Sequence, residues 1–114
     1  MMERIDARQF LSSLSGQAIE TYSGRRNIVL AVEGEHVLVG TERSPKGQPI
    51  PLEWIQSALD RLIDEGEVEI SVPSLGYRSA FVGAVMLALP GVVKSVNPPR
   101  ARLVGHPGLP LDRK

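Results

Sequence analysis

The chain has no cysteine, no net charge and no long apolar run, and each absence excludes a class of protein. Without cysteine it forms neither disulfides nor thiolate metal sites, which fits a reducing, cytoplasmic environment. Thirteen basic and thirteen acidic residues cancel, so no overall field attracts nucleic acid or an anionic membrane. The longest apolar run, residues 80–89, is half the length of about 20 residues that a membrane-spanning helix needs. The first eight residues are too charged for a signal peptide. We therefore expect a cytoplasmic protein that contacts no membrane.

The sequence also lacks the groupings of residues that catalysis and metal binding require. Its two histidines, His36 and His106, are isolated, and neither has a second histidine or a suitably spaced carboxylate beside it. No Gly-x-Ser-x-Gly elbow supplies a serine nucleophile, and the Gly-x4-Gly-Lys-Ser/Thr phosphate loop is absent. Glu67 and Glu69 share one face of a predicted strand, where alternation indicates solvated carboxylates. We expect no catalytic residue, no metal, no cofactor and no enzyme activity.

Length and composition are those of one folded domain: 114 residues, of which 42% are hydrophobic and 23% are charged. Proline and glycine occupy nearly every second position between Gly105 and Pro110. Such a segment does not form regular structure, so we expect a domain over residues 1–103 and a flexible tail or linker over residues 104–114.

Charge is segregated along the chain although its sum is zero. Residues 53–69 hold six acids and one base, whereas residues 78–114 hold six bases and one acid. One interpretation is a solvated acidic helix and strand followed by a basic tail. The other is that the basic C-terminal part approaches a polyanion or an acidic partner.

Hydrophobic periodicity predicts a helix and a hairpin in the first half of the chain. Apolar residues at helical spacing favour a helix over residues 4–15, which Gly16 ends. Runs rich in β-branched residues at 28–32 and 36–41 flank Glu33-Gly-Glu35 and predict two hairpin strands. Residues 17–22 are expected to be extended, and residues 42–48 to form a loop.

In the second half, proline and glycine residues between Pro49 and Pro90 mark the expected ends of helices and strands most clearly. A helix is predicted to start near Pro51 and to end at Gly66, with an apolar face. Residues 67–72 alternate and predict a strand with Val68, Ile70 and Val72 inward. A turn follows, and then a helix that is apolar on all sides and therefore buried, with Ser79 as its N-cap. A last strand is expected over residues 92–96.

These elements predict an α+β domain, with a mostly antiparallel sheet of three or four strands and three helices. The last helix is expected to be central to the core. A winged-helix variant is the alternative architecture.

Arg25, Arg26 and Asn27 form the first candidate site, beside Gly24 in a predicted turn. Guanidinium forks bind phosphates bidentately, and backbone N–H groups are free in such a turn. The alternative is a solvated hairpin tip.

Arg43, Ser44 and Lys46 form the second candidate site, in the loop that precedes the central helix. They offer charge and a hydroxyl close to a helix N-terminus, where anions bind. If both connections lie at one end of the sheet, these cations join Arg25 and Arg26. A solvated loop is again the alternative.

Tyr77, Arg78 and Ser79 form the third candidate site, at the start of the buried helix. An aromatic ring, a cation and a hydroxyl there suit a phosphate or a base. The alternative makes Ser79 a simple cap and packs Tyr77 onto the core. Trp54, near the edge of the amphipathic helix, is expected to be partly buried or to face a partner.

Several segments together resemble a small accessory module of bacterial restriction endonucleases and related DNA-defence proteins. They are Arg25-Arg-Asn-Ile, Thr41-Glu-Arg-Ser, Ile50-Pro-Leu-Glu-Trp-Ile-Gln-Ser-Ala-Leu, Gly66-Glu-Val and Arg78-Ser-Ala-Phe-Val-Gly-Ala-Val-Met-Leu-Ala-Leu-Pro-Gly91. The resemblance covers residues 10–103 and implies a non-catalytic domain that helps to recognise DNA or to organise a multidomain nuclease. An HNH nuclease often accompanies such modules, but two isolated histidines do not supply its motif here.

The leading hypothesis is a non-catalytic nucleic-acid-binding or specificity module of a DNA-processing or restriction system, with DNA as partner. Phosphate contacts are assigned to Arg25, Arg26, Arg43, Lys46 and Arg78, with secondary contacts from Asn27, Ser44 and Tyr77. The rival is a protein-interaction or oligomerisation domain, including a homodimer or the partner of a nuclease domain. It would use Trp54 and the small residues of the buried helix, which are Gly83, Ala84 and Ala88.

Overall fold

The computed structural model describes residues 3–107, which form four helices and two antiparallel sheets. The helices are α1 (Ala7–Ser13), α2 (Leu52–Glu65), α3 (Val72–Leu75) and α4 (Ser79–Leu87). The strands are β1 (Ala18–Glu20), β2 (Arg26–Glu33), β3 (His36–Gly40), β4 (Gln48–Pro51), β5 (Glu67–Glu69), β6 (Val92–Ser95) and β7 (Arg100–Leu103). The predicted α+β class is confirmed, but its strands divide into two sheets rather than one.

The first sheet has the order β1-β2-β3-β4 and contains the predicted hairpin. Strands β2 and β3 pair from Ile28 opposite Gly40 to Glu33 opposite His36, and Gly34 at the turn has φ 58°. Strand β4 was not predicted: its first residue, Gln48, was assigned to the loop, and Pro49 and Pro51 are poor strand formers. It lies at the edge of the sheet, where a residue without an N–H is tolerated.

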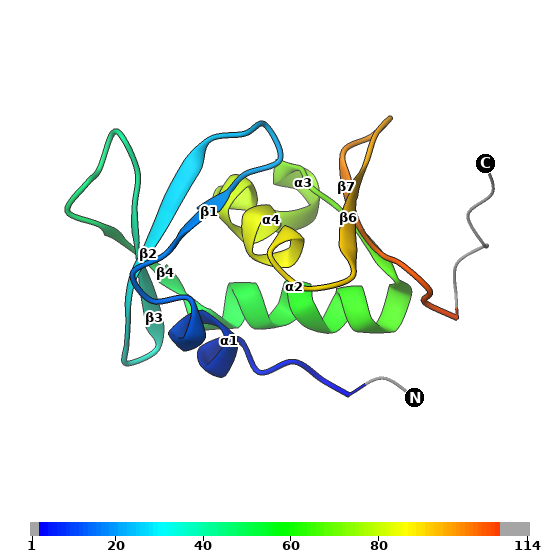
Figure 1. The fold of residues 1–114 in the computed structure, drawn as a ribbon, viewed down its shortest axis with the longest axis horizontal. Coiled ribbons are helices and arrows are strands. Elements are labelled where there is room, and N and C mark those ends of the chain that lie inside the picture. The colour runs from blue at the N-terminus through cyan, green and yellow to red at the C-terminus, as the bar shows by residue number, and fades with distance from the viewer. Residues whose placement is uncertain (1–2, 108–114) are drawn as a thin grey trace.

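Helix α2 agrees with its prediction and runs along the molecule between the two sheets (Figure 1). Its buried residues recur at helical spacing: Leu52, Ile55, Ala58, Leu59 and Leu62. Gly66 ends it in the left-handed conformation with φ 86°, and its N–H donates to the Leu62 carbonyl at 2.8 Å.

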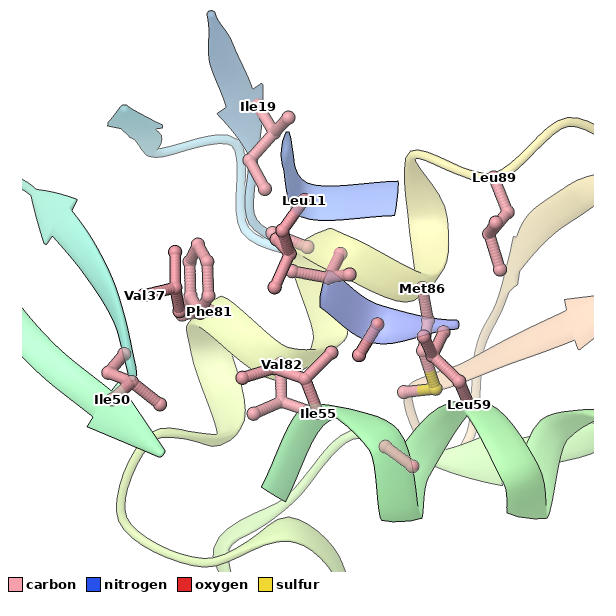
Figure 2. Close-up of a cluster of buried hydrophobic side chains, with 14 of the residues drawn as sticks. Leu11, Ile19, Val37, Ile50, Ile55, Leu59, Phe81, Val82, Met86 and Leu89 are labelled. Atoms are coloured by element: carbon pink, nitrogen blue, oxygen red, sulfur yellow. The ribbon is translucent and has the colours of Figure 1, made fainter. Parts of the chain in front are cut away.

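Helix α4 lies over α2 and between the sheets, as its uniformly apolar sequence predicts (Figure 1). All six residues from Phe81 to Met86 are buried. Figure 2 shows Phe81 pointing toward Val37 of β3, whereas Met86 points toward α2. The prediction for Ser79 is wrong: Arg78 occupies the N-cap position, without a side-chain cap bond, and Ser79 is the first helical residue.

The strand predicted over residues 67–72 is too long. It ends at Glu69, and the Ser71 side chain accepts a hydrogen bond from the Ser74 N–H as the N-cap of α3. Val72 opens that helix and is 55% exposed, so its predicted inward orientation is wrong. A serine cap followed by Pro73 in the first turn favours a helix start over a continued strand.

The second sheet has the order β5-β7-β6, and its central strand was not predicted. Arginines alternate with apolar residues in β7, but over only four residues, of which Ala101 alone is fully buried. The predicted strand at residues 92–96 is confirmed as β6.

Packing also continues into residues 104–107, which were expected to belong to the tail. The Val104 N–H donates to the Gly91 carbonyl at 2.9 Å. His106 is 8% exposed, with its Nε2 2.6 Å from the Ile63 carbonyl oxygen. The remainder of that tail, residues 108–114, lies outside the described residues.

Gly83 should be required by its contact with Ile70. A Cβ at residue 83 would lie 2.7 Å from the Cγ2 of Ile70 and 3.2 Å from two more of its carbons. We expect Gly83→Ala to lower the free energy of unfolding by about 1–3 kcal/mol through overpacking. In an Ile70→Ala background the same change should stabilise the protein, because alanine exceeds glycine in helix propensity by about 1 kcal/mol. Urea unfolding of the unchanged protein, the two single variants and the double variant tests whether the sign of the effect of Gly83→Ala reverses. Equal effects of Gly83→Ala in both backgrounds would refute the contact.

Candidate functional site

A groove of about 710 Å³ opens between the first sheet and the start of α4. Three segments distant in sequence surround it: the β1–β2 turn, the end of β3 with its following loop, and the entrance to α4. The lining residues are Thr21, Gly24, Arg25, Arg26, Asn27, Val39, Thr41, Glu42, Arg43, Gln48, Ile50, Tyr77, Arg78, Ala80 and Phe81. Members of all three predicted candidate sites therefore share one groove.

The β1–β2 turn is closed by Thr21. Its Oγ1 accepts a hydrogen bond from the Arg25 N–H at 3.0 Å, and its own N–H donates to the Arg25 carbonyl at 2.8 Å. Gly24 has φ 93°, which favours glycine, and its N–H donates to the Thr21 carbonyl. These bonds fix the backbone of the turn and leave the side chains of Arg25 and Arg26 exposed.

The loop after β3 is closed in the same manner by Thr41. Its Oγ1 accepts from the Ser44 N–H at 3.1 Å, and its N–H donates to the Ser44 carbonyl at 3.2 Å. Arg43 lines the groove, but Ser44 and Lys46, predicted for the same site, do not. Ser44 contributes its backbone to the loop, and Lys46 is exposed outside the groove lining.

The entrance to α4 brings Tyr77 and Arg78 to the groove but not Ser79. Tyr77 is 92% exposed, so the interpretation that packs it onto the core is wrong. Its neighbour Arg78 is also exposed.

The groove is rich in cations that have no partner in the described part of the chain. Among residues 3–107, none of the guanidinium groups of Arg25, Arg26, Arg43 and Arg78 has an ion-pair or hydrogen-bond partner. Glu42 is the one acid in the lining. Four cations and one acid in the lining give the groove an excess of positive charge despite the zero net charge of the chain.

Arginines elsewhere in the fold contrast with these four. Arg4 forms an ion pair with Asp64 at 2.9 Å, and Arg8 lies 3.4 Å from Glu35. Arg61 donates to Ser74, and Arg100 lies 3.5 Å from Glu67. These four guanidinium groups therefore have partners within the described chain, whereas those around the groove remain available to a ligand.

The floor of the groove is apolar except for one amide. Val39, Ile50 and Phe81 are each 3% exposed or less, and Asn27 is 8% exposed. Asn27 is held by backbone pairing with Ile19 of β1, yet its side chain has no hydrogen-bond partner in the described part of the chain. Its amide atoms are not among the described polar atoms that are both shielded from solvent and unpartnered, so they are accessible from the groove to a ligand with donors and acceptors.

Trp54 lines a second hollow of about 570 Å³, against α3. It is 42% exposed, in agreement with the expected partial burial. Tyr77 lines both hollows and so forms the boundary between them. Arg61 also lines the second hollow, but its guanidinium group already donates to the Ser74 carbonyl at 2.9 Å and to the Ser74 Oγ at 3.1 Å.

Sequence reasoning identified the cations of the groove but not its apolar floor or the threonines that close its loops. Val39, Ile50 and Phe81 have the same apolar character as core residues that line no cavity. Nothing in the local sequence separates the two groups.

The described residues show no metal centre and no membrane-spanning element. Over residues 3–107, no three His, Asp or Glu side chains are grouped so that they could hold a metal ion. No helix in that range is long and apolar enough to cross a membrane. The sequence matches no protein-family model, and comparisons with curated proteins and with solved structures return no match.

The groove arginines should be dispensable for folding. We expect Arg25→Ala, Arg43→Ala and Arg78→Ala each to change the free energy of unfolding by less than about 0.5 kcal/mol, because no protein partner is lost. The matched control is Arg100→Ala, which removes bonds to Glu67 and Ser95 and should cost about 1–3 kcal/mol. Urea unfolding measures both, and a cost above about 1 kcal/mol for the groove variants would assign them to the scaffold.

Proposed function

We propose that the protein is a non-catalytic nucleic-acid-binding module whose contact surface is the groove between the first sheet and α4. The observation that carries this proposal is the set of four guanidinium groups that lack protein partners among residues 3–107 and surround one hollow. Guanidinium groups bind phosphate oxygens through paired hydrogen bonds, and phosphate contacts supply most of the affinity for nucleic acid.

The zero net charge is compatible with this proposal because the opposite charges occupy different places. Arg4 neutralises part of the acidic surface of α2 by pairing with Asp64, and Asp60 lies 3.9 Å from the same guanidinium nitrogen. The groove contains Glu42 as its one acid within the described chain. A cleft focuses its local potential, so an anionic ligand is attracted to the groove rather than to the molecule as a whole.

The proposed module is non-catalytic and would act as part of a DNA-processing or restriction system. Its resemblance to accessory modules of bacterial restriction endonucleases motivates this setting, in which a nuclease partner supplies the catalytic residues. The groove itself offers cations, an amide and an aromatic ring, which bind and orient a ligand.

The rival proposal is a protein-interaction or oligomerisation domain, and one exposed residue favours it. Trp54 is 42% exposed beside a hollow, and tryptophan is enriched in the central contacts of protein interfaces. The other half of the rival argument is weaker, because Gly83 and Ala84 are buried. The close contact at Gly83 is made by the side chain of Ile70 from within the same chain.

Titration of DNA into the full chain should separate the two proposals. We expect affinity to fall with salt, and Arg25→Ala/Arg26→Ala to weaken binding by roughly ten-fold or more. The double change should also reduce the slope of log affinity against log salt by about 1 to 2, because two phosphate contacts are lost. Fluorescence anisotropy of a labelled oligonucleotide at low and moderate salt measures both quantities.

The matched control is Arg4→Ala/Arg8→Ala, which removes the same charge from arginines that are already paired. It should leave affinity and salt slope nearly unchanged. Equal losses in the two double variants would indicate a general charge effect, and the absence of binding at low salt would refute the proposed function.

A further inference from the structure

We propose that the ligand is single-stranded nucleic acid, with one unpaired base in the arginine groove and a neighbouring base beyond Tyr77 stacked on Trp54. This inference rests on the proposed function and names the form of nucleic acid that the groove takes.

The hollow shape of the groove argues for an unpaired base. Duplex DNA presents its base edges at the bottom of its own grooves, so a protein reads them with a projecting helix or β-ribbon. Here the phosphate-binding side chains surround a depression whose floor is Asn27, Val39, Ile50 and Phe81. A base reaches such a floor only when it is free to leave the stack, as in a single strand.

The floor has the chemistry of a base pocket rather than of a simple anion site. Val39, Ile50 and Phe81 offer apolar contacts for the faces of a ring. Asn27 is 8% exposed as a residue, and its solvent-accessible amide supplies donors and an acceptor that no other described residue uses. A base edge carries both donors and acceptors and would satisfy that amide, whereas inorganic phosphate at neutral pH offers mainly acceptors.

The single strand of nucleic acid continues beyond the groove in contact with the side chains of Tyr77 and Trp54. Tyr77 is 92% exposed and lines both hollows, while Trp54 is 42% exposed in the second. Aromatic side chains bind successive bases by stacking, without a requirement for sequence. The second hollow contains Glu53 and an Arg61 that is bonded to Ser74, so it suits the uncharged face of a base better than a phosphate.

Trp54 is the only tryptophan of the chain, so its fluorescence reports on the second hollow alone. The experiment titrates the full chain with a single strand of about ten nucleotides, with the same sequence as a blunt duplex, and with a mononucleotide. We expect the single strand to bind at least ten-fold more tightly than the duplex and to quench Trp54. The mononucleotide should bind through the groove with much less quenching, because its single base cannot occupy both hollows.

Two variants test the named contacts. Tyr77→Ala should weaken binding of the single strand several-fold and reduce quenching, whereas Tyr77→Phe should retain both, since the exposed ring is all that stacking needs. Asn27→Leu should weaken binding of the single strand without changing its salt slope, and circular dichroism checks that it folds.

Three outcomes would overturn the inference. If the duplex binds as tightly as the single strand and Trp54 is not quenched, the ligand form is wrong while the proposed function stands. If the single strand binds and Asn27→Leu has no effect, no base occupies the floor. If neither nucleic acid binds at low salt, the inference and the proposed function fail together.

Discussion

The fold depends on the burial of α4, whose residues Phe81 to Met86 have almost no exposed surface. The helix contacts α2, α3 and strands of both sheets, so rotation or translation would expose apolar side chains on several sides. Gly83 allows Ile70 to approach closely from the segment after β5. Because α4 is fixed in this way, its exposed entrance at Tyr77 and Arg78 is also fixed relative to the first sheet.

The groove follows from this placement and from two similar loops on the opposite side. In each loop a threonine, Thr21 or Thr41, accepts a hydrogen bond from a backbone N–H of the loop through its Oγ1. The loop backbones are thus ordered by their own hydrogen bonds, and the adjacent arginine side chains are not needed for that purpose. Cations held on a rigid scaffold bind a polyanion with a smaller loss of conformational entropy than cations on mobile segments. The same arrangement explains how a chain of zero net charge presents a positive surface.

The sequence predicted the elements whose patterns are strong and local. The spacing of Leu52, Ile55, Leu59 and Leu62 and the stop at Gly66 define α2, and the unbroken apolar run defines α4. Strand β7 was not predicted because its alternation of arginine with apolar residues extends over only four residues. Residues 70–72 were assigned to a strand by their alternation, although Ser71 and Pro73 favour a helix start. The four arginines that line the groove were named, but their proximity depends on the tertiary packing of three separate segments, which no local pattern contains.

The most direct test of the account is an NMR titration of the ¹⁵N-labelled full chain with a short single-stranded oligonucleotide. The account predicts that shifts concentrate in three segments, at residues 21–27, 41–43 and 77–81, and that the side-chain amide of Asn27 is among the most strongly perturbed signals. Residues of the second sheet, such as Val93 and Arg102, should change little. Shifts confined to the second sheet, or no shifts at saturating oligonucleotide, would contradict the claim that the arginine groove is the binding site.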